Sequence, residues 1–320
     1  MKHYIIYAII ISLLTGITTS CGKEEKPEAT DWDINWFEIR DKPGVLNQAI
    51  YKVYKETGIP IFYNDTLGKQ ITGWDYEGNP VVHYELLRPG YTIQSMSFTN
   101  DYYLSKDSLS LSAGVEVFHK HVLKRLPKDY FSKSYLFVDS LIKNESYSEW
   151  TWKEYRFVQK AMSTTIVGSL AGFKELDEAE KIKWADKVLG GLLAPYIQSK
   201  YATRLEKEYY ILSYTPKGAS RYHYPIPQSK FIPPIRRKAE YWGFFGFVDG
   251  KGGNMSPREE GDVAAFISRA VSKQSAEEFY KEYEKWPKIK GKYKRIRKSK
   301  IKREISALAE REVEKIQNEY

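Results

Sequence analysis

Cys21 is the only cysteine among the 320 residues, so no internal disulfide can hold this chain together. Any compact structure must therefore rest on a hydrophobic core. Hydrophobic residues make up 42% of the chain and aromatic residues 15%, which excludes a disordered or low-complexity protein. The length suits one large domain or two small ones.

Residues 1–20 have the three parts of a secretory signal peptide. Lys2 precedes an apolar run over residues 4–14, and the small-residue segment TGITTS follows, directly before Cys21. A membrane span needs roughly 20 apolar residues, and this run is much shorter. We therefore expect a cleaved signal rather than a transmembrane helix.

Cys21 and the residues around it resemble the lipidation site of a bacterial lipoprotein, in which the thiol is diacylated and becomes the first residue of the mature chain. Two or three acyl chains anchor a protein firmly. An ordinary secretory signal with an incidental free cysteine is the alternative. Residues 21–32 are polar and charged and predict a flexible tether. Lys23, Glu24 and Glu25 resemble the signal that sends lipoproteins of the Bacteroidota to the outer face of the outer membrane.

No linker or repeat divides residues 33–320, which predicts one α+β domain. A helical pattern over 175–201 has Asp177 as N-cap and Glu180 three residues later, the signature of a capping box. Further segments are assigned by periodicity and by Gly or Pro at their ends. Helices are expected over 43–58, 110–126, 256–270 and from Ser275 to the end with interruptions at Pro287 and Gly291; strands over 59–65, 80–87 and 135–141; an irregular loop over 223–238.

Several motifs occur in an order that resembles a known family. They are the lipoprotein start, ETGIPIFYND, LPKDYFSKSYLFVDSL and GFVDGKGGNMSPREEGDVAAFI. Together they resemble the substrate import-associated zinc metallohydrolase lipoproteins of the Bacteroidota. The resemblance implies a zincin-like single domain with a small mixed sheet and several long helices, ending in a basic helix.

The family's catalytic signature, HExxH, is absent from this chain. In that motif two histidines at i and i+4 bind zinc from one face of a helix while the glutamate activates water. The mature chain has only His83, His119, His121 and His223, and none has a partner at i+4. On a helix, His119 and His121 point about 200° apart and cannot share one ion. We expect them to be partly exposed histidines without a metal.

The resemblance places the catalytic helix on the segment KVLGGLL. Lys187 and Gly191 then stand at the two histidine positions and Val188 at the position of the general base. A buried helix packed closely through Gly190 and Gly191 explains the same residues without any site.

The last metal ligand of such sites usually comes from a second helix. Here Asp262 stands in the family's Asp position, and Ala265 stands where the final glutamate would coordinate. Glu259 and Glu260 are expected in the first turn of this helix, where acidic groups interact favourably with the helix dipole. Lys187, Val188, Gly191, Asp262 and Ala265 are therefore read as remnants of a lost site.

Residues 288–303 carry ten basic side chains among sixteen positions. On a cell-surface protein, such a segment favours lipopolysaccharide phosphates, acidic glycans or a neighbouring protein over nucleic acid. The candidate polyanion contacts are Lys294, Arg295, Arg297 and Lys298. A solvated basic helix, balanced by the acidic residues after it, is the alternative.

Two functions from different classes follow from these patterns. The first is a non-catalytic lipoprotein of the outer membrane, facing the cell exterior, without a cofactor, that acts as an accessory binding component beside a SusC/SusD-type TonB-dependent importer of peptide or glycan. The second is a zinc-dependent metallohydrolase or peptidase with non-standard ligands. We favour the first, because a catalytic zinc needs three protein ligands and no three residues here have a recognisable spacing.

Overall fold

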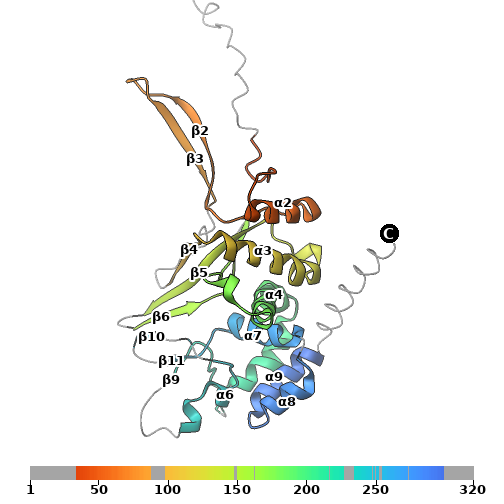
Figure 1. The fold of residues 1–320 in the computed structure, drawn as a ribbon. Coiled ribbons are helices and arrows are strands. Elements are labelled where there is room, and N and C mark those ends of the chain that lie inside the picture. The colour runs from red at the N-terminus through yellow and green to blue at the C-terminus, as the bar shows by residue number, and fades with distance from the viewer. Residues whose placement is uncertain are drawn as a thin grey trace, which may run out of the picture. The chain divides into compact units, whose positions relative to one another are not determined.

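The computed structural model describes residues 34–87, 98–147, 150–161, 163–215, 217–226, 234–246, 248, 250–251, 254–272 and 274–298. The signal peptide, Cys21 and the tether lie outside these residues. The chain divides into two units, Met1–Trp36 and Phe37–Tyr320, and every element below belongs to the second. The fold is α+β, with helices and a mixed sheet (Figure 1).

The helical elements alternate with strands in the first half of this unit and dominate the second half. The α-helices are α2 Val45–Thr57, α3 Ser108–His121, α4 Glu178–Lys200, α5 Ala202–Arg204, α6 Ala239–Trp242, α7 Glu259–Val271, α8 Ala276–Glu282 and α9 Pro287–Lys298. Short turns of helix are η2 Leu123–Arg125, η3 Lys128–Tyr130, η4 Phe173–Glu175, η5 Leu205–Tyr209, η6 Tyr210–Ser213 and η7 Pro234–Arg237. No helix within the described ranges is both long and apolar enough to cross a membrane.

The strands form one larger sheet and two small ones. The larger sheet has the order β10-β6-β5-β8-β7, and β1 and β4 also pair with β5. The strands are β1 Ile61–Phe62, β2 Thr66–Trp74, β3 Pro80–Leu86, β4 Phe98–Leu104, β5 Ser134–Tyr147, β6 Trp150–Tyr155, β7 Val158–Lys160, β8 Thr164–Val167, β9 Pro225–Ile226, β10 Gly250–Lys251 and β11 Asn254–Met255.

Strand β5 is the centre of the larger sheet, and its two halves pair differently. Its first half lies parallel to β1 and β8, while its second half is antiparallel to β4 and β6. The run Tyr135–Val138 is fully buried, as expected for a strand covered on both faces. The sheet is therefore mixed because of this one strand.

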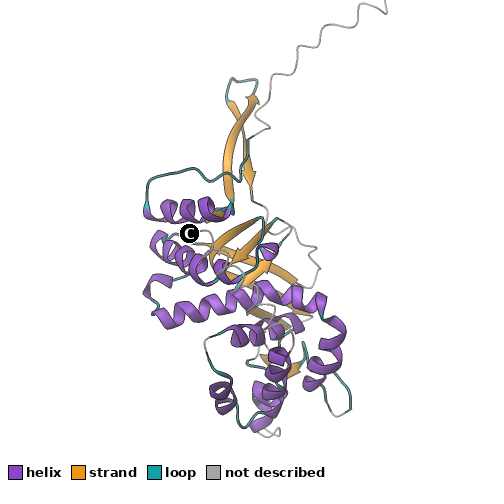
Figure 2. Ribbon diagram, turned by 90° about the vertical axis from the view of Figure 1, so that its right-hand side faces the viewer, coloured by secondary structure: helices purple, strands orange, loops and turns teal. Residues whose placement is uncertain are grey.

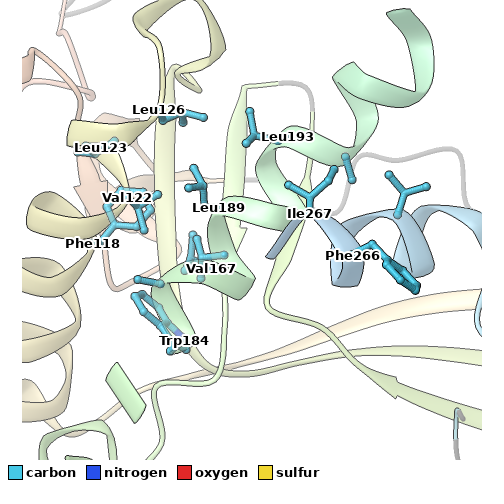
Figure 3. Close-up of a cluster of buried hydrophobic side chains, with 14 of the residues drawn as sticks. Phe118, Val122, Leu123, Leu126, Val167, Trp184, Leu189, Leu193, Phe266 and Ile267 are labelled. Atoms are coloured by element: carbon cyan, nitrogen blue, oxygen red, sulfur yellow. The ribbon is translucent and has the colours of Figure 1, made fainter. Parts of the chain in front are cut away.

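Side chains that alternate along β5 enter two different cores. Tyr135 and Phe137 join the larger cluster with α2, α3, α4 and α7, whereas Leu136 and Val138 join a smaller cluster with Leu87. Figure 3 shows part of the larger core, in which side chains of α3 and α4 meet Val167 of β8 and α7 lies beside α4. The helices thus cover one face of the sheet.

Helix α4 begins as its sequence predicts. The Asp177 carboxylate accepts a hydrogen bond from the backbone N–H of Glu180 at 2.7 Å, and the Glu180 carboxylate accepts one from the N–H of Asp177 at 3.2 Å. This completes the capping box. Val188 and Leu189 are fully buried on the face that packs against the sheet and α7. The prediction of this helix and of its buried face is confirmed.

Strands β2 and β3 form a two-stranded ribbon that has no third strand within the described residues. The ribbon projects from the larger sheet (Figure 2). Ile71 pairs with Val82 and Trp74 with Pro80, which places Ile71, Trp74 and Tyr84 on one face. All three side chains are exposed, and that of Trp74 is 68% exposed. The ribbon therefore has an apolar face that the described part of the chain leaves uncovered.

The structure corrects three expectations and assigns one segment for which the sequence made no prediction. Strand β5 runs to Tyr147, well beyond the predicted end at Leu141, since its second half pairs with β4 and β6. The aromatic segment from Trp150 to Lys160, left unassigned by its sequence, supplies β6 and β7. The final helical segment breaks between α8 and α9, but Gly291 lies inside α9 and does not interrupt it. The loop predicted over 223–238 contains β9 and η7, and residues 227–233 lie outside the description.

Candidate functional site

A cavity of about 310 Å³ lies where α4, α7 and the β6–β7 segment meet. Its volume is at the lower end of the roughly 300–1,000 Å³ that is usual for small-molecule sites. Both polar and apolar groups face it. The lining residues are Glu154, Tyr155, Arg156, Phe157, Val158, Lys187, Gly191, Phe245, Glu260, Gly261, Ala264, Ala265, Ser268 and Arg269.

Small residues let the two helices at this cavity approach closely. A Cβ on Gly190 would press on the carbonyl oxygen of Ala264 and would lie 3.1 Å from the backbone nitrogen of Ser268. A Cβ on Gly191 would lie 2.9 Å from the Cβ of Val158. Gly190 therefore lets α4 approach α7 closely, and Gly191, which lines the cavity, lets α4 approach Val158. The expected close packing through these two glycines is found.

Three of the five predicted remnants lie together at this cavity. Lys187 and Gly191 reach it from α4, and Ala265 reaches it from α7. Val188 is instead a fully buried core residue. Asp262 does not line the cavity and is buried on another side of α7. The three positions that the resemblance assigns to metal ligands thus lie together. None of the three offers a ligand atom for a metal: the protonated amine of Lys187 has no lone pair, and Gly191 and Ala265 have no polar side-chain atom.

One end of the cavity holds a network of charged groups around Arg156. Its guanidinium donates two hydrogen bonds to one carboxylate oxygen of Glu154, at 2.8 and 3.0 Å. Glu260, in the first turn of α7, lies 3.9 Å away on the other side of the guanidinium. The Arg156 side chain is 15% exposed and that of Glu154 20%, so this pair is only partly screened by water. The charge of Arg156 is therefore largely compensated within the protein.

The other end of the cavity holds two cations that stand over aromatic rings. The Lys187 ammonium lies 4.6 Å from the ring centroid of Phe157, and the Arg269 guanidinium lies 5.5 Å from that of Phe245. Burial lowers the pKa of Lys187, and the nearby charges of Arg269 and Lys183 lower it further. Lys187 has no carboxylate partner among the described residues.

Arg269 is paired more loosely than Arg156. Its guanidinium lies 3.8 Å from a carboxylate oxygen of Glu282 and 3.5 Å from the hydroxyl of Tyr283, both on the side of α8. Burial raises the pKa of that Tyr283 hydroxyl to about 12, so the phenol stays neutral. Of the two cations at this end of the cavity, only Arg269 has a carboxylate partner among the described residues, Glu282, so the positive charge of Lys187 is not neutralised by a carboxylate.

Asp262 takes part in a buried polar cluster with α9. The Lys292 ammonium donates to a carboxylate oxygen of Asp262 at 2.7 Å, to the hydroxyl of Tyr222 at 2.8 Å and to the carbonyl of Gly243 at 3.1 Å. The Tyr222 hydroxyl donates to the same carboxylate oxygen at 2.6 Å. All three ammonium protons are thus satisfied. Burial lowers the pKa of Lys292 to about 8 and raises that of Tyr222 well above its ordinary value.

Three of the histidines contact different partners. His119 is partly exposed and lies 2.9 Å from Glu56, and burial lowers its pKa. His83 lies 3.6 Å from Glu85 on the ribbon, and His223 contacts Arg258 at 3.2 Å. Across the part of the chain that the structure describes, no group of three or more His, Cys, Asp or Glu side chains is placed to hold a metal ion.

The basic C-terminal segment is only partly available to solvent. Lys294 is exposed, whereas Arg295 is partly buried and donates to the carbonyl of Gly291 at 3.2 Å. Lys292, in the middle of the segment, is fully buried. The side chains of Arg297 and Lys298 lie outside the description.

The sequence analysis missed three charged residues of the cavity, Glu154, Arg156 and Arg269. Glu154 lies in β6 and Arg156 directly after it, in a segment that was not assigned, and Arg269 has no motif around it. The alternation of charged and aromatic residues in WTWKEYRF, which is typical of a strand with two different faces, was the available signal.

Comparison of the chain with known protein families, with curated proteins and with solved structures finds no match.

Proposed function

We propose that this chain is a non-catalytic, zincin-like lipoprotein that binds a small ligand in the cavity between α4 and α7. The observation that carries the proposal is the convergence of Lys187, Gly191 and Ala265 on that one cavity. Positions so far apart in sequence come together here only through the packing of α4 on α7. This convergence supports the alignment with the family's metal site.

The chemistry of these three residues favours binding over catalysis. A protonated amine has no lone pair for zinc, and neither a glycine hydrogen nor a methyl group can coordinate a metal. Asp262, the remaining acidic position of the motif, is held by Lys292 and Tyr222. What remains is a concave, partly apolar site with a few charged groups, which is the usual form of a ligand pocket.

The proposed setting comes from the N-terminus. A diacylated Cys21 would anchor the chain in the outer membrane, and the tether over 21–32 would let the folded unit stand at the cell exterior. There it would serve as an accessory component beside a SusC/SusD-type importer of peptide or glycan. Lys294, which is exposed, supports a contact with lipopolysaccharide or another polyanion, and Arg295, Arg297 and Lys298 are proposed with it.

The test of this proposal is to compare the natural chain with a variant in which the metal site is restored. Lys187→His, Gly191→His and Ala265→Glu together place three zinc ligands around the cavity. We expect about one equivalent of tightly bound zinc in this triple variant and none in the natural chain by elemental analysis. The natural chain should not cleave casein or a peptide library.

A matched control carries Lys183→His in place of Lys187→His, because Lys183 is exposed on the same helix and does not line the cavity. This control should not bind zinc tightly. Stoichiometric zinc in the natural chain, or metal-dependent peptide cleavage by it, would establish the metallohydrolase alternative instead.

A further inference from the structure

The unbalanced positive charge at one end of the cavity indicates the chemical class of its ligand. Lys187 and Arg269 both line this end, from α4 and α7 respectively. Like charges placed near each other are unfavourable, and an anion between them removes the repulsion. Lys187 has no carboxylate partner among the described residues, and Arg269 has Glu282 at 3.8 Å. Arg156, in contrast, donates two hydrogen bonds to Glu154 and has Glu260 at 3.9 Å. A ligand anion is therefore expected at the Lys187 end alone.

The surroundings of these two cations are apolar. Phe157 lies beneath the Lys187 ammonium and Phe245 beneath the Arg269 guanidinium, and both rings line the cavity. Ala264 and Ala265 add apolar surface along α7. Both cations also remain in contact with water, since Lys187 is exposed and the Arg269 side chain is 41% exposed, so their attraction for an anion is partly screened and the rings add apolar contact. A ligand with an apolar group next to its anion fits both features.

We infer that the cavity binds a carboxylate-bearing ligand, with the carboxylate between Lys187 and Arg269 and an adjoining apolar group against Phe157 and Phe245. This inference rests on the proposed function of the same cavity. A guanidinium is suited to a planar carboxylate because it can donate two parallel hydrogen bonds, and an ammonium adds a point charge. The cavity volume of about 310 Å³ limits the bound part to a small group.

A carboxylate of this kind has two sources in nutrient uptake, the free C-terminus of a peptide and the acidic group of a uronic-acid sugar. Four probes separate them: N-acetyl-leucyl-phenylalanine, its C-terminal amide, digalacturonate and the neutral galactose disaccharide. Binding of each probe to the purified full-length chain is followed by isothermal titration calorimetry and by NMR shifts of the cavity residues. We expect one acidic probe to bind at least about tenfold more tightly than its neutral partner, which is about 1.4 kcal/mol.

The variant Lys187→Met removes the charge while it keeps a chain of similar length. It should reduce the preference for the acidic probe to less than about twofold, and Lys187→Arg should restore it. Lys183→Met is the matched control, because it removes a charge from the same helix outside the cavity, and it should keep the preference. Unfolding midpoints of the variants show whether each one is folded.

The outcomes separate this inference from the proposed function. If acidic and neutral probes bind equally well to the natural chain and to Lys187→Met, the ligand class is wrong while binding in the cavity stands. If an acidic probe binds but shifts only resonances outside the cavity, the inference is also wrong. If none of the four probes shifts a cavity residue, both the ligand class and the binding function of the cavity are contradicted.

Discussion

The ammonium of Lys292 lies 2.7 Å from a carboxylate oxygen of Asp262, and neither side chain is more than 1% exposed. Helices α9 and α7 are therefore joined by an ion pair inside the protein. The rings of Tyr209, Tyr222 and Phe244 lie within 5.0 Å of the ammonium, measured to their centroids. The carboxylate of Asp262 therefore has a structural partner in α9.

Removal of one partner of this pair should be costly. Lys292→Met leaves the carboxylate of Asp262 buried without its cation, and we expect the free energy of unfolding to fall by about 3–5 kcal/mol. The exposed neighbour substitution Lys294→Met should change it by less than about 0.5 kcal/mol. Both values come from urea unfolding. The double variant Lys292→Met with Asp262→Leu should recover most of the loss, since an apolar pair needs no charge partner. Equal effects of Lys292→Met and Lys294→Met would contradict the buried pair.

The same pair predicts a pH dependence of stability. The pKa of Lys292 is about 8 in the folded chain and 10.5 ordinarily, so between these values the unfolded chain binds the extra proton. Stability from this group therefore rises with pH, by up to about 1.4 kcal/mol per unit. Above pH 10 the raised pKa of Tyr222 has the opposite effect, because the unfolded chain then loses the phenol proton first.

The measurement compares the natural chain with Lys292→Met at roughly pH 7, 8.5 and 9.5, where the tyrosine contribution is small. The unfolding free energy of the natural chain should rise relative to that of the variant across this series. A constant difference between the two proteins would mean that Lys292 does not titrate in this range.

Gly190 should tolerate no side chain. Alanine is intrinsically better than glycine in a helix by about 1 kcal/mol. Here, however, the added methyl would press on the carbonyl oxygen of Ala264 in α7. We expect Gly190→Ala to destabilise the chain by about 1–3 kcal/mol, as overpacking does. Lys183→Ala on the exposed side of α4 is the control and should be nearly neutral. A stabilised Gly190→Ala variant, measured by thermal unfolding, would show that the two helices are not in contact at this point.

Two tryptophans should respond very differently to truncation. Trp184 is 4% exposed, packs edge-on against Phe173 and donates its indole N–H to the carbonyl of Gly168 at 3.0 Å. Trp184→Ala should cost about 3–5 kcal/mol of unfolding free energy. Trp74, on the ribbon, is 68% exposed, and Trp74→Ala should cost less than about 0.5 kcal/mol. A large loss from Trp74→Ala would mean that the ribbon face is covered within this chain.

The capping box of α4 offers a substitution that separates hydrogen bonding from charge. Asp177→Ala removes the acceptor for the Glu180 N–H, and the expected loss is about 1 kcal/mol. Asp177→Asn keeps an acceptor at this position and should cost much less. Chemical denaturation of both variants provides the comparison. If alanine and asparagine cost the same, the cap makes no measurable contribution.

The sequence predicts elements whose signals are local and repeated. For α4, the capping residues Asp177 and Glu180 and the apolar spacing around Val188 lie within a few turns of one another. The same is true of α2, which ends at Thr57 and has Gly58 as its C-cap in the left-handed conformation. The α+β class follows from such segments, because helices and strands can each be recognised from their own period.

The sequence does not reveal partners that lie far apart along the chain. Lys292 is one of many basic residues in its segment, and its burial depends on Asp262, 30 residues earlier. The cavity likewise depends on Arg156 of the β6–β7 segment meeting Glu260 of α7. Pairings of this kind are decided by the tertiary packing of α7, so charge and periodicity alone indicate the residues but not their neighbours.

The β2–β3 ribbon contributes little to the core, since Leu67 is its only side chain packed against either buried cluster. Ile71, Trp74 and Tyr84 are thus free of the packing constraints that fix residues such as Phe137. Substitutions on this face can accumulate without loss of the fold. The sequence of this ribbon face can therefore change during evolution while the packing of α4 on α7 stays the same.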